Sequence, residues 1–134
     1  KMLDCTQLLK EYHLKVTPQR IAIVAEIDMK GHINIDDLFN SLKTKFPSIS
    51  LATIYKNIHA MIDKMFLSEV QIPNEKSVYE LTKELHSHLV CKNCKSIEDI
   101  NLDTSSLLNE VTHKSNFKLE EVSVVFLGLC NECS

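Results

Sequence analysis

Two cysteine pairs constrain the fold of this chain more than any other feature. Cys91 and Cys94 are separated by two residues, and after 35 further residues Cys130 and Cys133 repeat the spacing. Each pair can place two thiolates on one tight turn, so the pattern predicts a Zn(Cys)4 site that ties the start of the second half to its last strand. Disulfides and a thioredoxin-like redox pair are the alternatives. A reducing compartment disfavours the first, and the lack of a βαβ pattern disfavours the second.

Length and charge allow two small domains of different character. The 134 residues, 44% of them hydrophobic, can form one compact domain or two smaller ones. The net charge of −3 hides an asymmetry: residues 1–66 hold 9 Lys/Arg against 7 Asp/Glu (+2), and residues 67–134 hold 6 against 11 (−5). No apolar run approaches the roughly 18 residues of a membrane span, and the start lacks a signal-peptide pattern. We therefore expect a cytoplasmic protein with a mildly basic first half.

The first half has the periodicity and start signals of four helices. Thr17 before Pro18, Asn34 and Ser50 are suitable N-caps, and Pro47 stops the third helix. The apolar positions at helical spacing are Leu3, Leu8 and Leu9; then Ile21, Val24, Ala25 and Ile27; then Ile35, Leu38, Phe39, Leu42 and Phe46. A fourth helix follows Ser50.

Strand patterns replace helices beyond the fourth helix. The runs FLSEVQI and SVYEL flank a turn at residues 73–76 and predict a hairpin. Further strands are predicted at HLVC, SIEDINL and KLEEVSVVFLGLC, with a helix over residues 103–113. This order predicts an α+β protein. A winged helix-turn-helix DNA-binding domain would occupy residues 1–83, and a small α/β domain residues 84–134.

The fourth helix is the candidate for reading DNA. On a helical wheel of about 100° per residue, Leu51, Ile54, Ile58, Met61, Ile62 and Met65 share one side, and Ala52, Lys56, His59 and Asp63 face away. Thr53 and Tyr55 lie at the borders. A small residue, a hydroxyl, an aromatic ring and a cation in the first two turns suit a recognition helix. An ordinary amphipathic surface helix remains the alternative.

Two histidines next to the first cysteine pair suggest a second metal site. His86 and His88 are two residues apart, so they project from one face of a strand and could chelate a divalent ion. Two ligands are too few for a site, and a polar strand face is the alternative. Glu80, Asp99 and His32 could complete the ligand set after folding.

Taken together, four segments resemble the ferric uptake regulator family of bacterial metal- and peroxide-responsive repressors: VTPQR, FPSISLATIYKNI, HSHLVCKNC and GLCNEC. The resemblance implies a homodimer on palindromic operators, with a C-terminal dimerisation domain and a structural zinc on the four paired cysteines. It also implies a regulatory Fe²⁺ or Mn²⁺ site made of His32, Glu80, His86, His88 and Asp99. The candidate DNA contacts are Arg20, Ser50, Ala52, Thr53, Tyr55 and Lys56.

Within this family, three positions bear on the signal. Iron-responsive members usually carry a further histidine where Val122 stands, and a glutamate where Asp99 stands, so both positions resemble the peroxide sensors. Glu80 instead resembles the iron branch. We expect a peroxide-sensing repressor in which iron-mediated oxidation modifies His32 or His86, with an iron-responsive regulator, or a zinc-responsive one of the same fold, as the alternative.

The rival from another class is a zinc enzyme such as a nucleobase deaminase. Its signature needs His-x-Glu and a proline before the cysteine pair. Here Leu89 and Val90 follow His88, and no proline precedes Cys91 or Cys130. Four cysteines on one zinc would also leave no position for a reactive water. The sequence therefore predicts a regulator and not an enzyme.

Overall fold

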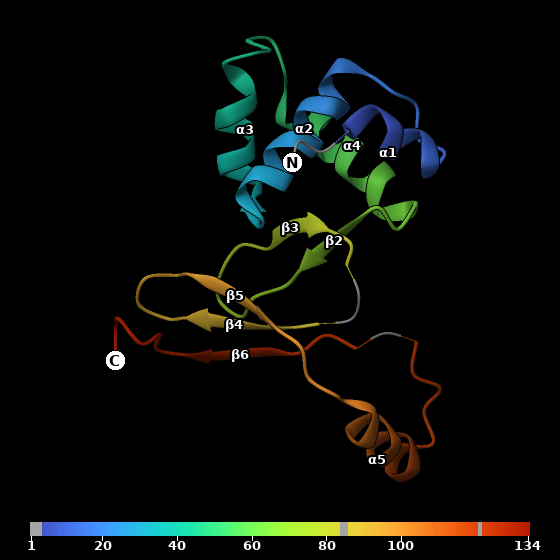
Figure 1. Ribbon diagram of the computed structural model, residues 1–134, viewed down its shortest axis with the longest axis vertical. Helices are drawn as coiled ribbons and strands as arrows, with labels where there is room; N and C mark the ends of the chain where they lie inside the picture. Colours follow the sequence, from blue (N-terminus) through green and yellow to red (C-terminus); the bar gives the residue numbers. More distant parts are fainter. Residues whose placement is uncertain (1–3, 84–85, 121) are drawn as a thin grey trace. The chain divides into compact units, whose positions relative to one another are not determined.

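The computed structural model describes residues 4–83, 86–120 and 122–134 (Figure 1). Within these ranges the chain forms five α-helices and six β-strands. The strands make two small three-stranded sheets, which confirms the predicted α+β class. The chain divides into two compact units, Lys1–Thr82 and Lys83–Ser134. Among the described helices, none has the length and apolar character needed to span a membrane.

Four helices of the first unit begin at side-chain caps. They are α1 (Cys5–Glu11), α2 (Pro18–Lys30), α3 (Ile35–Lys43) and α4 (Leu51–Asp63). The cap side chains of Asp4, Thr17, Asn34 and Ser50 each accept the backbone N–H three residues further on, at 2.8–3.2 Å. A cap of this kind satisfies an N–H that the helix itself leaves unpaired. The predicted caps at Thr17, Asn34 and Ser50 are thus confirmed, whereas Leu3 lies outside the described residues.

The predicted hairpin forms a wing after α4. Strands β2 (Leu67–Val70) and β3 (Val78–Leu81) pair antiparallel around the turn, and the short strand β1 (Ile33–Asn34) joins the other side of β3. The sheet order is β1-β3-β2. Helices α1 to α3, helix α4 and the wing therefore follow one another as the sequence predicted.

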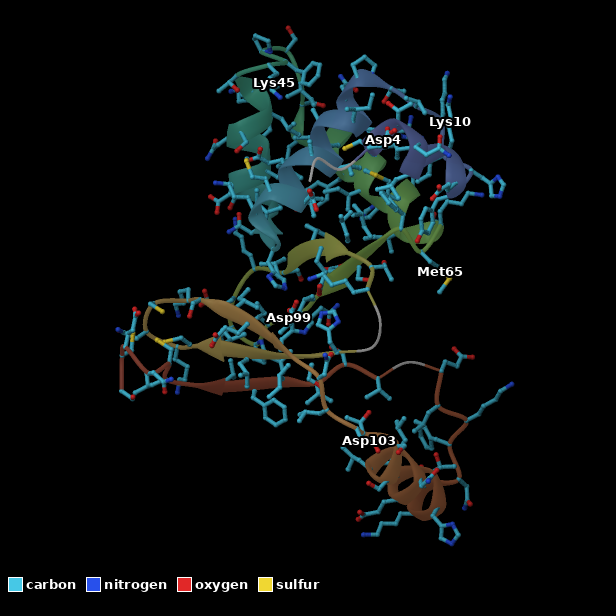
Figure 2. The ribbon with its side chains drawn as sticks, viewed as in Figure 1. Asp4, Lys10, Lys45, Met65, Asp99 and Asp103 are labelled. Carbon is cyan, nitrogen blue, oxygen red and sulfur yellow. The ribbon has the colours of Figure 1, made fainter. Side chains whose placement is uncertain are left out.

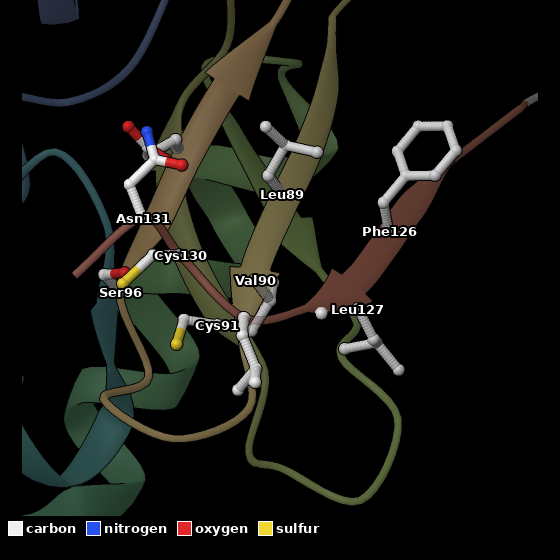
Figure 3. A pocket seen from close by; sticks show the side chains of 11 residues that line it. Leu89, Val90, Cys91, Ser96, Phe126, Leu127, Cys130 and Asn131 are labelled. Carbon is white, nitrogen blue, oxygen red and sulfur yellow. The ribbon is translucent and has the colours of Figure 1, made fainter. Parts of the chain in front are cut away.

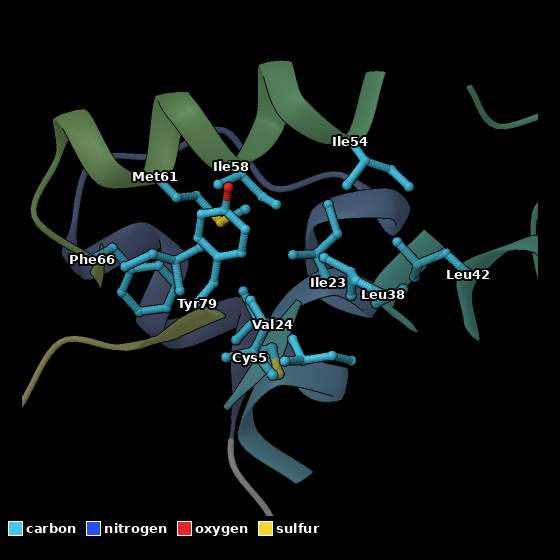
Figure 4. Close-up of a cluster of buried hydrophobic side chains, with 14 of the residues drawn as sticks. Cys5, Ile23, Val24, Leu38, Leu42, Ile54, Ile58, Met61, Phe66 and Tyr79 are labelled. Atoms are coloured by element: carbon cyan, nitrogen blue, oxygen red, sulfur yellow. The ribbon is translucent and has the colours of Figure 1, made fainter. Parts of the chain in front are cut away.

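One hydrophobic core holds the first unit together. Figure 4 shows side chains of three helices meeting Phe66 and Tyr79, with Cys5 of α1 at the edge: Ile23, Val24, Leu38, Leu42, Ile54, Ile58 and Met61. Several of them are completely inaccessible to solvent, including Ile58 and Met61. The prediction that Ala25 belongs to the apolar stripe of α2 is wrong as far as packing is concerned. Ala25 is exposed and Ala22 and Ile23 are buried, because α2 packs against α1, α3 and β3 and Ala25 lies on the side away from them.

Helix ends account for the other errors in the first unit. Helix α3 ends at Lys43, so Phe46 contacts the core from the following loop. Helix α4 ends at Asp63, and Met65 takes a left-handed conformation with φ 61°. Its side chain is 74% exposed and points away from the unit (Figure 2). Leu51, at the start of α4, is also exposed, so the apolar face of this helix is shorter than the wheel predicted.

The second unit is a three-stranded sheet with one helix. Strands β4 (Ser87–Cys91) and β5 (Ile97–Ile100) pair antiparallel, and β6 (Val125–Gly128) pairs parallel with β4 after a crossover that contains α5 (Ser105–Ser115). The predicted long final strand from residue 118 is wrong. β4 offers partners only from His88 to Cys91, and a strand extends only as far as its ladder.

Helix α5 stands apart from the sheet of its own unit (Figure 1). All of its residues are described, and none of them is buried. Leu107 is 52% exposed and Val111 41% exposed. An amphipathic helix without a covering surface in its own unit leaves an apolar face for another surface.

Candidate metal and DNA-binding sites

The four paired cysteines meet at one end of the second sheet. Cys91 ends β4, and its ladder partner is Gly128 at the end of β6. The Lys92 N–H donates to the Gly128 carbonyl at 2.8 Å, so the turn after each strand starts at the same level. Cys94 lies in the first turn, and Cys130 and Cys133 in the second. Figure 3 shows Cys91 at the end of β4 and Cys130 in the segment that follows β6.

The sulfur geometry suits a tetrahedral zinc ion. The four Sγ atoms lie within 4.8 Å of one another, and those of Cys94 and Cys130 are 3.8 Å apart. Zn–S bonds of about 2.3 Å in a tetrahedron separate the sulfurs by about 3.8 Å. No disulfide bond joins any two of the cysteines at positions 91, 94, 130 and 133, so the disulfide alternative finds no support. The cluster suits a structural zinc ion with no open coordination position.

The pKa values of three of the thiols also favour the binding of a cation. Donation by the backbone N–H of Cys130 and then of Cys94 lowers the pKa of Cys91 to about 6. Hydrogen bonding to Ser96 lowers the pKa of Cys94. Asn93 donates to Cys133, yet the neighbouring Cys130, Cys91 and Cys94 raise the pKa of Cys133 to about 11. The cluster thus favours some thiolates but not four, unless a divalent ion compensates their charge.

Polar side chains support this cluster from outside. The Asn93 amide lies 3.3 Å from the Cys133 Sγ, and the Ser96 hydroxyl lies 3.2 Å from the Cys94 Sγ. Such groups orient the thiolates of a metal site and disperse their charge. Beside them lies an open pocket of about 390 Å³ whose apolar lining includes Leu89, Phe126 and Leu127 (Figure 3).

His32 and Glu80 form a pair in the first unit. The register Ile33↔Tyr79 between β1 and β3 places His32, just before β1, opposite Glu80. The His32 Nε2 lies 3.7 Å from a Glu80 carboxylate oxygen, and the Glu80 side chain is 1% exposed. Burying a carboxylate is costly unless partners compensate its charge. A buried glutamate facing an imidazole nitrogen is a suitable pair of donors for a divalent ion.

His86, His88 and Asp99 form a second donor group within the second unit. His88 on β4 is the ladder partner of Asp99 on β5, and His86 lies two residues earlier on the same face. Both Nε2 atoms are 3.6 Å from the same oxygen, Asp99 Oδ1, and the two rings are 4.5 Å apart. The prediction that the two histidines point the same way is confirmed, although His86 lies just before β4 and not within it. Imidazole and carboxylate donors suit Fe²⁺ or Mn²⁺.

Lys83 contacts this donor group, and the sequence analysis did not identify it. Its Nζ lies 2.9 Å from Asp99 Oδ2, the second oxygen of the carboxylate whose Oδ1 faces the histidines. No spacing rule connects residue 83 with residue 99, because only the pairing of β4 with β5 brings them together.

Helix α4 presents its polar face as predicted. Ala52, Lys56 and His59 are exposed, and the Tyr55 and His59 rings lie 6.0 Å apart. The Ser50 and Thr53 hydroxyls are 2.9 Å apart, so both are engaged at the helix N-terminus. A DNA contact by any of these residues stays a prediction.

Arg20 has an internal role that the sequence did not reveal. Its Nε donates to the Asn57 Oδ1 at 2.9 Å, and its guanidinium also donates to the Lys15 carbonyl at 3.1 Å. Asn57 in turn donates to the Thr53 carbonyl at 2.9 Å. Arg20 therefore fixes α2 against α4.

Comparison with known proteins places these features in one family. Residues 11–127 match the Ferric uptake regulator family. The peroxide operon regulator of Bacillus subtilis is 28% identical over 136 residues, which cover 100% of this chain and 94% of that protein. The crystal structure of the Campylobacter jejuni peroxide stress regulator is 32% identical with a TM-score of 0.69, covering 98% of this chain and 100% of that one.

A solved structure of the iron branch is similar to a comparable degree. The Vibrio cholerae ferric uptake regulator is 30% identical with a TM-score of 0.72, covering 95% of this chain and 100% of that one. The match to the family extends over most of the chain, and its two donor groups and four-cysteine cluster suit a regulatory and a structural metal. The chain belongs to the ferric uptake regulator family, whose members are metal-dependent repressors that bind DNA operators as dimers and are not enzymes.

Proposed function

We propose that this chain is a peroxide-sensing repressor in the cytoplasm that binds a palindromic operator as a homodimer. Residues 1–83 would bind DNA, and residues 84–134 would form the dimer and hold the structural zinc. The donor chemistry of the two histidine groups carries the proposal. It is supported by the similarity to the Bacillus subtilis and Campylobacter jejuni peroxide regulators.

The regulatory ligands we propose are His32, Glu80, His86, His88 and Asp99. The first two belong to one unit and the other three to the second unit. If both groups serve one Fe²⁺ or Mn²⁺, metal binding selects one arrangement of the two units and so one spacing of the recognition helices in the dimer. The metal then acts as corepressor.

The DNA contacts we propose come from α4 and its surroundings. Lys56 and Tyr55 are the principal candidates, because their side chains lie on or at the border of the exposed face. Ala52 lets the backbone approach the DNA closely, and Ser50 and Thr53 lie at the N-terminal end that enters a groove. Arg20 would contribute to DNA binding by fixing α4 through its hydrogen bond to Asn57, and a guanidinium N–H not used in that bond could donate to a phosphate.

Iron held by these residues would supply the chemistry that reduces H₂O₂. The overall reaction inserts one oxygen atom into a ring C–H bond of histidine and reduces the peroxide to water, so the peptide gains about 16 Da. His32 and His86 are the proposed targets, because their imidazole rings would hold the ion and so lie next to the site of peroxide reduction. An oxidised imidazole no longer completes the ligand set, and the DNA is released.

Glu80 favours a second candidate, an iron-responsive regulator. A glutamate reaches further than an aspartate and can chelate through both oxygens, which would fill the position that peroxide needs. The Vibrio cholerae ferric uptake regulator is about as similar to this chain as the peroxide regulators are. In this alternative, reversible loss of Fe²⁺ releases the DNA without oxidation.

Mass spectrometry of peptides after H₂O₂ treatment separates the two candidates. The iron-loaded protein should gain about 16 Da on peptides with His32 or His86 and lose operator affinity, whereas the manganese-loaded protein should not react. Glu80→Asp is the matched variant: faster oxidation would show a sensor that Glu80 slows. If neither the iron-loaded parent nor iron-loaded Glu80→Asp gains oxygen while Fe²⁺ still promotes DNA binding, the iron-responsive candidate replaces the peroxide sensor.

A further inference from the structure

The Asp99 carboxylate of the second unit divides its two oxygens between different partners. Oδ1 faces the Nε2 atoms of His86 and His88, each at 3.6 Å. Oδ2 faces the ammonium of Lys83 at 2.9 Å. The Lys83 ammonium thus pairs with one oxygen of a carboxylate whose other oxygen faces two histidines that could bind a cation. Asp99 is labelled in Figure 2.

Stability of the fold does not explain this pair. The Lys83 side chain is 46% exposed and that of Asp99 33% exposed, and an ion pair at such a position contributes little to folding. Its effect on a second cation is different. A divalent ion that takes Oδ1 must share the carboxylate with the ammonium, and it can chelate through both oxygens only if the lysine leaves. Two positive charges at such short range repel each other even with solvent screening.

We propose that Lys83 weakens cation binding at His86, His88 and Asp99 and restricts Asp99 to coordination through one oxygen. Lys83 is thereby a residue that sets the metal concentration at which the repressor responds. The proposal rests on the proposed function in one respect, since it takes these three residues as regulatory ligands. It needs no contribution from the first unit.

The test is an Mn²⁺ titration of the full-length, zinc-containing protein, with free Mn²⁺ followed by electron paramagnetic resonance. Lys83→Met should lower the dissociation constant on the order of tenfold, the effect of removing one nearby positive charge. Lys83→Arg keeps the charge and should stay near the parent. The matched control is Lys114→Met, which removes a lysine paired at 2.9 Å with Glu110 on α5 and should leave the affinity unchanged.

Salt provides a second readout that a merely structural role of Lys83 would not affect. The gap between the parent and Lys83→Met should narrow as NaCl rises, because the repulsion is screened. Unchanged or weaker Mn²⁺ binding in Lys83→Met, with the parent still binding, overturns this inference alone. If Mn²⁺ binding survives Asp99→Asn together with His86→Ala, the ligand set itself is wrong, and the proposed function and this inference fail together.

Discussion

The two units of this chain are stabilised by different means. In Lys1–Thr82, helices and wing share a core in which side chains such as Leu9, Ile23 and Ile58 are fully buried. In the described part of Lys83–Ser134, the buried hydrophobic residues are Val90 and Cys91. Large apolar side chains remain exposed there: Leu102, Leu107, Val111, Phe117, Leu119, Phe126, Leu127 and Leu129.

This difference indicates where each unit obtains its stability. The first unit has a continuous buried core of apolar side chains, and their burial is its main source of stability. The second unit has a small sheet, an uncovered helix and a four-cysteine cluster, so we expect its stability to depend on a bound metal and on a surface that covers the helix. Because the family acts as dimers, a second copy of the chain is the expected cover.

The largest expected effect is loss of the zinc cluster. Cys91→Ser or Cys130→Ser should remove one zinc per chain and abolish the stable dimer, because binding free energies of about 10–16 kcal/mol are folding free energy for such small zinc units. Metal analysis and sedimentation would measure both losses, and the first unit should still unfold cooperatively. A folded dimer without zinc would contradict the comparison.

A core truncation in the first unit should have the next largest effect. Ile58 is fully buried, so Ile58→Ala should lower the free energy of unfolding by about 2–5 kcal/mol. Leu107→Ala on α5 is the control, since that side chain is 52% exposed. Its effect should appear in the dimer dissociation constant and not in the unfolding of the first unit. Equal effects of the two variants on denaturant unfolding would remove the distinction between the units.

Substitutions on the exposed face of α4 should lower the affinity for DNA without lowering the stability of the fold. Lys56→Ala should weaken operator binding and lower the slope of log affinity against log salt by about one unit, as expected for one lost phosphate contact. Tyr55→Ala should weaken binding with a smaller change in slope. Lys64→Ala, at the other end of α4, is the charge-matched control. An unchanged slope would leave Lys56 without a phosphate role, and unchanged affinity in both variants would remove α4 as the reading element.

The smallest expected effect is the loss of one helix cap. The Ser50 hydroxyl accepts the Thr53 N–H at 3.1 Å, so Ser50→Ala should cost about 0.5–2 kcal/mol of stability. Ser50→Gly should cost only a few tenths of a kcal/mol, because glycine is tolerated at this position. Denaturant unfolding of both variants without DNA would measure this, and equal stability of Ser50→Ala and the parent would show that the cap is dispensable.

Local sequence determined the elements whose signals lie within a few residues of each other. Thr17, Asn34 and Ser50 start helices because their side chains reach a backbone N–H three residues away. The turn composition predicts the wing hairpin. The spacing of the paired cysteines predicts their cluster, because each pair lies on one tight turn. These interactions are short in sequence, so a pattern of residue types is sufficient to predict them.

Only the tertiary structure decided the features that depend on register and packing between distant segments. The length of β6 is set by the available partners on β4, and the buried face of α2 by its neighbours, which exclude Ala25. The roles of Arg20 at Asn57 and of Lys83 at Asp99 arise from contacts 37 and 16 residues apart. A sequence specifies the chemistry of such side chains, but the partner that each one meets is fixed only when strands and helices align.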